Sequence, residues 1–180
     1  KKLITLLALT IGFSMNAQLA TVTENSNTGQ RLSTSNAANH GNIGSNAVDL
    51  SYSSTSSSTR GATGAYSTAM GEVTTASGDY STAMGEGTTA SGYKATAMGE
   101  DTTSSAWYST AMGSSTTAGG DASTAMGRST TASGSYSTAM GRETTASGSY
   151  SIAMGRSTTA SEIYSIAMGR STTASGYGST

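Results

Sequence analysis

The stretch YSTAMGRETTASGS at residues 136–149 is one unit of the repeat that decides the fold of this chain. Units of the same length run without insertions from Tyr66 to the end of the sequence. In each unit a methionine follows an alanine, precedes a glycine and stands 14 residues after the previous one. Such a strict, short period is typical of solenoids. The methionines of this register are Met70, Met84, Met98, Met112, Met126, Met140, Met154 and Met168.

Each unit contains two short stretches suited to β-strands. Ser67–Met70 and Thr74–Ser77 carry β-branched residues, and glycines lie between such stretches, where turns need a positive φ. A 14-residue unit is too short for a helix-turn-helix repeat, and its glycines disfavour helix. The sequence therefore predicts an all-β, parallel β-solenoid with coils of 14 residues.

Strand alternation assigns the side chains of a coil to two faces. The simplest arrangement places Thr68, Met70 and Ala76 inside, so that the methionines form a core ladder. Ser67 and Ala69 then form an outer face of small residues. Because one methionine per coil buries little apolar surface against the entropy of ordering the coil, we expect a second chain to pack on this face. A closed symmetric oligomer is the usual solution.

The repeat resembles the YadA-like head repeats of trimeric autotransporter adhesins, which recur about every 14 residues around the motif S-V-A-I-G. Residues 137–141 match this motif with Thr in place of Val and Met in place of Ile, and residues 151–155 and 165–169 match it more closely. The resemblance covers residues 62–180 and implies a left-handed parallel β-roll that assembles as a homotrimer. It also implies that the side chains at the Val and Ile positions point into the roll.

The sequence divides into three regions. Residues 1–17 have two lysines followed by a short apolar stretch, the pattern of a signal peptide, so we expect an exported protein that is secreted or held at the cell surface or outer membrane. Residues 18–61 are rich in Ser, Thr and Asn and include a degenerate repeat around Leu50, followed by an inserted serine loop. Residues 62–180 are the head repeats, and we expect the sequence to be part of a longer protein because it stops within a repeat.

The composition argues against several classes of function. The chain has 180 residues and a net charge of -1, unlike nucleic-acid modules, which are usually basic. It has no cysteine, and its one histidine, His40, lacks the clustered partners of a metal site and is expected at the surface. The repeats contain no histidine to activate a serine, and the calcium-like sequence at 119–121 occurs once. We therefore predict no catalytic, cofactor-binding or metal-binding residue, no cofactor and no enzyme.

Two rows of side chains follow the repeat. The candidate binding row consists of tyrosines at one position, interrupted by Lys94 and Ala122, and we expect it at an exposed turn where aromatic rings can contact a ligand. A second row, directly after each Met-Gly pair, changes from Glu72, Glu86 and Glu100 to arginines from Arg128 onward. The tyrosines of the candidate binding row are Tyr66, Tyr80, Tyr108, Tyr136, Tyr150 and Tyr164.

These patterns favour a surface fibre or adhesin head segment that attaches to a host, matrix or cell-surface ligand. Two alternatives stay open. Thr75, Ser77 and their equivalents are expected to point outward as a regular grid, which an ice-binding solenoid would use. The repeats are also compatible with a structural spacer of a fibre that binds no ligand.

Overall fold

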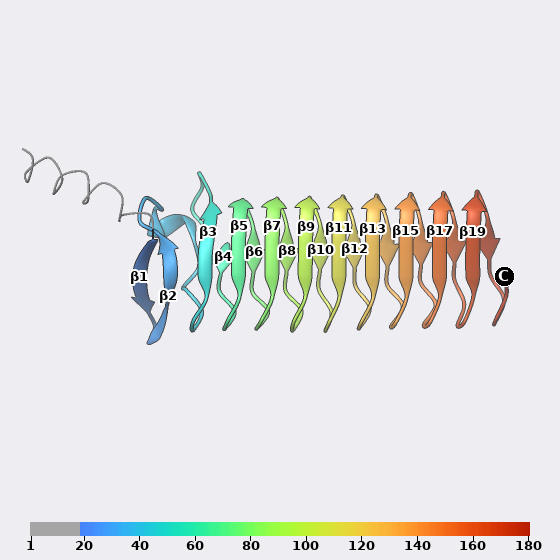
Figure 1. Ribbon diagram of the computed structural model, residues 1–180, viewed down its shortest axis with the longest axis horizontal. Helices are drawn as coiled ribbons and strands as arrows, with labels where there is room; N and C mark the ends of the chain where they lie inside the picture. Colours follow the sequence, from blue (N-terminus) through green and yellow to red (C-terminus); the bar gives the residue numbers. More distant parts are fainter. Residues whose placement is uncertain (1–18) are drawn as a thin grey trace, which may run out of the picture.

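The computed structural model describes residues 19–180, so the expected signal peptide lies outside the described residues. The chain forms an elongated stack of coils in which long strands on one side alternate with short strands on the other (Figure 1). The long strands of the stack are β3 (Val48–Tyr52), β5 (Thr68–Glu72), β7 (Thr82–Glu86), β9 (Thr96–Glu100), β11 (Thr110–Ser114), β13 (Thr124–Arg128), β15 (Thr138–Arg142), β17 (Ile152–Arg156) and β19 (Ile166–Arg170). The short strands are β4 (Gly61–Ala62), β6 (Thr75–Ala76), β8 (Thr89–Ala90), β10 (Thr103–Ser104), β12 (Thr117–Ala118), β14 (Thr131–Ala132), β16 (Thr145–Ala146), β18 (Thr159–Ala160) and β20 (Thr173–Ala174).

The two kinds of strand form two parallel sheets, which confirms the predicted parallel β-solenoid. Each strand of the repeats pairs with its equivalent one coil away, and the register joins identical positions, as in Met112 with Met126. The same holds for the short strands, where Ala118 lies beside Ala132. The sequence period of 14 residues is therefore the length of one coil.

The N-terminal end of the stack is built differently. Strands β1 (Leu19–Glu24) and β2 (Asn27–Leu32) form an antiparallel hairpin, and β2 pairs in parallel with β3. A single turn of 3-10 helix, η1 (Ala37–Asn39), lies between β2 and β3 in the chain. Leu50 pairs with Met70, so the expected degenerate repeat is confirmed, and the inserted loop runs from β3 to β4. None of the helices within residues 19–180 is long and apolar enough to cross a membrane.

The interior of the roll is filled by small side chains, and the predicted placement of the methionines inside it is wrong. Ala111 and Ser109 are fully buried, whereas Met112 is only half-buried on the outer face. Met168, in the last long strand, is 60% exposed. The same outward placement applies to the other predicted core methionines, Met70, Met84, Met98, Met126, Met140 and Met154.

The reason is the narrowness of the coil. Within the repeats, the largest fully buried side chains are threonines such as Thr116, and the other buried positions hold Ala, Ser or Gly. An interior that holds no side chain larger than threonine has no room for methionine, so the strand alternation is as predicted but the inner and outer faces are exchanged. Ser67 and Ala69, expected outside as a contact surface for a second chain, lie inside, and Thr68 lies outside with Met70. The predicted inward position of Ala76 and the outward position of Thr75 and Ser77 are confirmed.

The glycine that follows each methionine has a steric role. Gly99 has a φ of +121°, and a Cβ built on it would overlap the carbonyl oxygen of Gly113 in the next coil. Neither the conformation nor the space admits another residue. Gly119, in contrast, lies where the other coils carry serine, with a conventional φ and open space around its Cα.

We predict that Gly99→Ala lowers the free energy of unfolding by about 3 kcal/mol or more, because it adds both backbone strain and a clash between coils. Gly119→Ala is the matched control and should change stability by less than about 0.5 kcal/mol. Urea unfolding followed by circular dichroism measures both values. Equal stability of the two variants would contradict the close approach of the coils at this glycine.

Candidate binding surface

The tyrosines of the candidate binding row lie at the turn that precedes each long strand. All six have a positive φ between 56° and 61°, and each is about half exposed. Lys94 and Ala122, which interrupt the row, have the same conformation, so they occupy the same turn position. The left-handed region is uncommon for residues other than glycine and asparagine. The predicted exposed turn is therefore confirmed, and each tyrosine holds it at a conformational cost.

The rings of neighbouring coils stack on one another. The ring centroids of Tyr136 and Tyr150 are 5.0 Å apart with planes inclined by 4°, and those of Tyr150 and Tyr164 are 5.2 Å apart. Tyr177 closes this group with an edge-on contact to Tyr164. This C-terminal aromatic group presents a continuous surface of rings that are half-exposed or more along the turns of four coils.

A second aromatic group lies toward the N-terminal end. Tyr66 and Tyr80 stack at 4.9 Å, and Trp107 packs beside Tyr93 at 5.6 Å between centroids. The Nζ atom of Lys94 lies 5.2 to 5.8 Å from the centroids of three rings, those of Tyr80, Tyr93 and Tyr108. The lysine that interrupts the tyrosine row is thus held by cation–π contacts. Ala122 separates this group from the C-terminal one.

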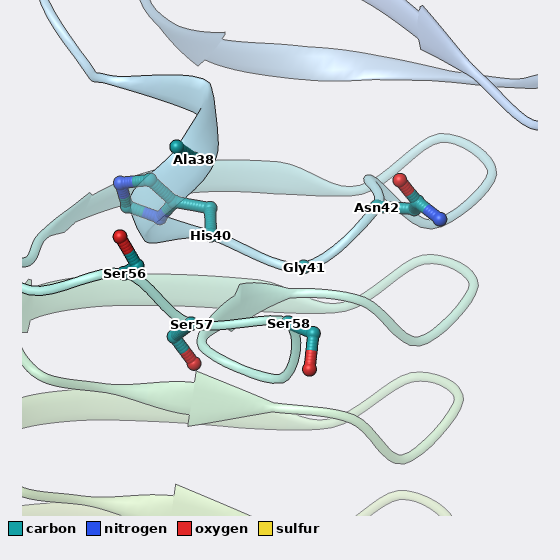
Figure 2. Close-up of a pocket in the computed structure, with 7 residues that line it drawn as sticks. All are labelled: Ala38, His40, Gly41, Asn42, Ser56, Ser57 and Ser58. Carbon is teal, nitrogen blue, oxygen red and sulfur yellow. The ribbon is translucent and has the colours of Figure 1, made fainter.

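A shallow pocket at the N-terminal end is lined by seven residues (Figure 2). His40 is the only titratable residue among them, and its ring lies on the side of Ala38, away from Asn42. The expected surface position of His40 is wrong, because the residue is only 6% exposed. The pocket is lined by Ala38, His40, Gly41, Asn42, Ser56, Ser57 and Ser58.

Behind the pocket, His40 belongs to a buried polar cluster centred on Asp49. The Asp49 carboxylate accepts hydrogen bonds from Ser51 Oγ at 2.6 Å and Arg31 Nε at 3.2 Å, and the His40 Nδ1 atom lies 3.2 Å from its second oxygen. Arg31 also bonds to Glu24 at 2.9 Å. Burial lowers the pKa of His40. The negative charge of Asp49 opposes this effect, and the positive charge of Arg31 adds to it.

Serine, histidine and aspartate meet in this cluster, but not in the order that a nucleophilic triad needs. In a triad, one ring nitrogen faces the serine and the other faces the aspartate. Here Ser51 Oγ lies 3.4 Å from the same Nδ1 that faces Asp49, and Ser51 donates its proton to Asp49. Ser51 and Asp49 are also buried away from any substrate. The geometry suits a structural cluster that closes the end of the roll.

The sequence contained a signal for this cluster. Asp49 pairs in register with Ala69, so a carboxylate stands where the repeats have a buried alanine. A buried charge requires a partner, and an arginine in the preceding segment is the natural one. The calcium-like aspartate has a local role instead: the Asp121 carboxylate accepts a hydrogen bond from the backbone N–H of Trp107, one coil earlier.

Comparison with known families places the repeats. The model of the YadA head domain repeat matches the chain in overlapping stretches that together extend from residue 62 to residue 180. The matched stretches are 62–88, 90–116, 108–130, 118–144, 132–158, 146–172 and 160–180. No curated protein matches the chain.

We predict that Asp49→Ala destabilises the N-terminal end by about 2 to 3 kcal/mol, because the buried Arg31 keeps Glu24 but loses its second carboxylate, and Ser51 Oγ loses its acceptor. Alanine itself fits, since the equivalent residue is Ala69. Hydrogen exchange of β2 and β3 amides measures the effect. The control is Glu143→Ala, which breaks an exposed pair (side chains 49% and 45% exposed) and should cost less than about 1 kcal/mol. Similar protection in both variants would contradict the capping role.

Proposed function

The chain belongs to the YadA head domain repeat family, and from this premise we propose that it is the head segment of a trimeric surface adhesin. Membership implies an exported protein that is exposed at the cell surface. We propose that the head attaches to a host, matrix or cell-surface ligand, without enzymatic activity, through its repeated outer surface. The observation that carries this proposal is the aromatic row, whose rings are exposed and in contact along two groups of successive coils.

The trimer is supported by the outer face of the sheet that the long strands form together with β1 and β2. Its methionines are half-buried or exposed in the single chain, and they lie side by side from Met70 to Met168. Thr68 and its equivalents share this face, and Ile152 and Ile166 replace them near the C-terminal end. A contiguous apolar strip of this length on a soluble protein marks an interaction surface. We propose that three parallel chains bury it against one another.

We predict that the double variant Met112→Asp/Met126→Asp dissociates the trimer, because it places charges in the centre of the apolar strip. The matched control is Thr117→Asp/Thr131→Asp, on the outer face of the other sheet. Sedimentation equilibrium of residues 19–180 should give a trimer for the parent and control chains and a monomer for the methionine variant. A monomeric parent chain, or a trimeric methionine variant, would refute the proposed interface.

The attachment surface is supported by the backbone of the tyrosine row. A tyrosine in the left-handed region costs free energy that asparagine or glycine would avoid. Stacking between coils returns part of this cost, about 0.5 to 1.5 kcal/mol per pair. Exposed, rigid rings in a line also offer flat surfaces on which sugar rings or protein side chains can pack.

We predict that Tyr136→Asn/Tyr150→Asn/Tyr164→Asn keeps the fold, since asparagine tolerates the positive φ, but lowers attachment at least about tenfold. Attachment is measured with beads coated with the chain on host cells and extracellular matrix. Tyr52→Asn, which removes an exposed tyrosine outside the row, is the control. If the triple variant attaches as well as the parent chain, the row is structural. If the parent chain also fails to attach, the segment is a spacer.

A further inference from the structure

One row of side chains on the outer face is sorted by charge. It occupies the last position of each long strand, at the arrowheads of β3 to β19 in Figure 1, and successive members pair in register. Its charged members are all exposed. In order along the stack, this charge row consists of Tyr52, Glu72, Glu86, Glu100, Ser114, Arg128, Arg142, Arg156 and Arg170.

Most charges of this row have no oppositely charged partner among residues 19–180. Like charges follow one another at the strand spacing of about 4.8 Å, well inside the screening length of about 8 Å at physiological salt. Among residues 19–180, Arg142 is the one member that forms an ion pair, with the neighbouring Glu143. Ser114, between the two blocks, donates a long hydrogen bond of 3.4 Å to Glu100. An alternating order would pair the charges within the chain, whereas the sorted order leaves them for another molecule.

The order of the row is antisymmetric about Ser114. A two-fold rotation through this residue sets Glu100 opposite Arg128 of a second copy, Glu86 opposite Arg142, and Glu72 opposite Arg156. The same rotation brings Tyr52 opposite Arg170, a pairing suited to a cation–π contact. Each level of the row thus meets its complement, because every member is one strand from the next.

We propose that the charge row is a self-complementary interface through which two copies of this chain associate in antiparallel orientation. Two-fold interfaces are self-complementary in this way. A parallel, in-register neighbour brings Glu level with Glu and Arg level with Arg, so the proposed trimer does not use this complementarity. This interface is distinct from attachment to a host, matrix or cell-surface ligand, because it joins one head to another. Each head can take part as a single chain, or as a trimer that presents the charge row at its edge.

The flanking turn position is compatible with this pairing. It holds Asp101 and Glu143, which the two-fold rotation sets opposite Ser129 and Gly87 of the second copy. No acidic residue of the flanking position meets another one, and the side chains opposite them are small.

Charge exchange tests the pairing. The all-positive variant Glu72→Arg/Glu86→Arg/Glu100→Arg and the all-negative variant Arg128→Glu/Arg142→Glu/Arg156→Glu/Arg170→Glu should each fail to self-associate at low salt, where the parent chain does. An equimolar mixture should associate again. Sedimentation velocity measures this, and about 0.5 M salt should weaken the parent complex at least about tenfold. Glu162→Arg, which reverses an exposed charge outside the row, should behave as the parent chain.

Orientation is tested with cysteines, because the chain has none of its own. Ser114→Cys lies on the two-fold axis, so it should form an intermolecular disulfide at low salt at least about tenfold faster than Ser171→Cys, at the end of the stack. Equal rates for the two cysteines indicate a parallel assembly and overturn the proposal. It is also overturned if either charge variant associates alone, or if the mixture does not.

The competing occupant is an anionic polymer on the arginine half. In that case dextran sulfate binds the parent chain and not the all-negative variant, while the parent chain stays unassociated at low salt. This outcome overturns the antiparallel interface but leaves the trimer and the tyrosine row untouched. Because the measurement is self-association in solution, it is also independent of the bead attachment that tests the proposed adhesin.

Discussion

The parallel pairing of each coil with the next, without a slip in register, is the constraint on which the rest of this structure depends. Each side chain of the repeats has its own equivalent as a neighbour on both sides. A residue type that recurs at one position of the repeat therefore forms a continuous row of side chains along the stack. Stacked rings, an apolar strip and a charged row all follow from one residue choice repeated at intervals of 14. No insertion is tolerated within such a line, and the one long insertion, between β3 and β4, is accommodated in a loop before the regular repeats begin.

The narrow interior determines which of these lines face outward. Buried positions hold Ala, Ser, Thr and Gly, and several buried hydroxyls such as those of Thr88, Thr116 and Thr130 have no hydrogen-bond partner among the described residues. An interior of this kind contributes little apolar burial, and its unpaired hydroxyls oppose folding. The large apolar side chains stand outside instead. Most of the apolar surface of each coil therefore lies outside, where it can be buried only against another chain.

The repeat, its two strands per coil and the exposed tyrosine turn could be predicted from the sequence, because the period is a local property. The glycine after each methionine, expected at a turn, lies instead inside the long strand, as Gly71 does in β5. The direction of the faces could not be predicted. Alternation groups Thr68 with Met70 but does not say which group lies inside, and hydrophobicity alone favours the wrong answer when the interior is too narrow for methionine. The polar cluster around Asp49 was not predicted from the sequence for a different reason. Asp49 lies in the degenerate repeat, but Arg31 and His40 lie in segments without a period, and the pairing of β2 with β3 is what brings Arg31 beside Asp49.

The register determines where a row of side chains lies, but it does not determine the order of residues along that row. The sorted order of Glu and Arg in the charge row is therefore not required by the fold. The apolar strip needs a similar residue in every coil, and it has one. The row at the strand ends needs only a side chain that tolerates exposure, and any mixture of Glu, Arg and Ser would meet that need. Three glutamates before Ser114 and four arginines after it are a costly order for an isolated chain, since like charges side by side destabilise a sheet. The cost is recovered only against a surface with the opposite sequence of charges, and a second copy of the same row, reversed, is such a surface.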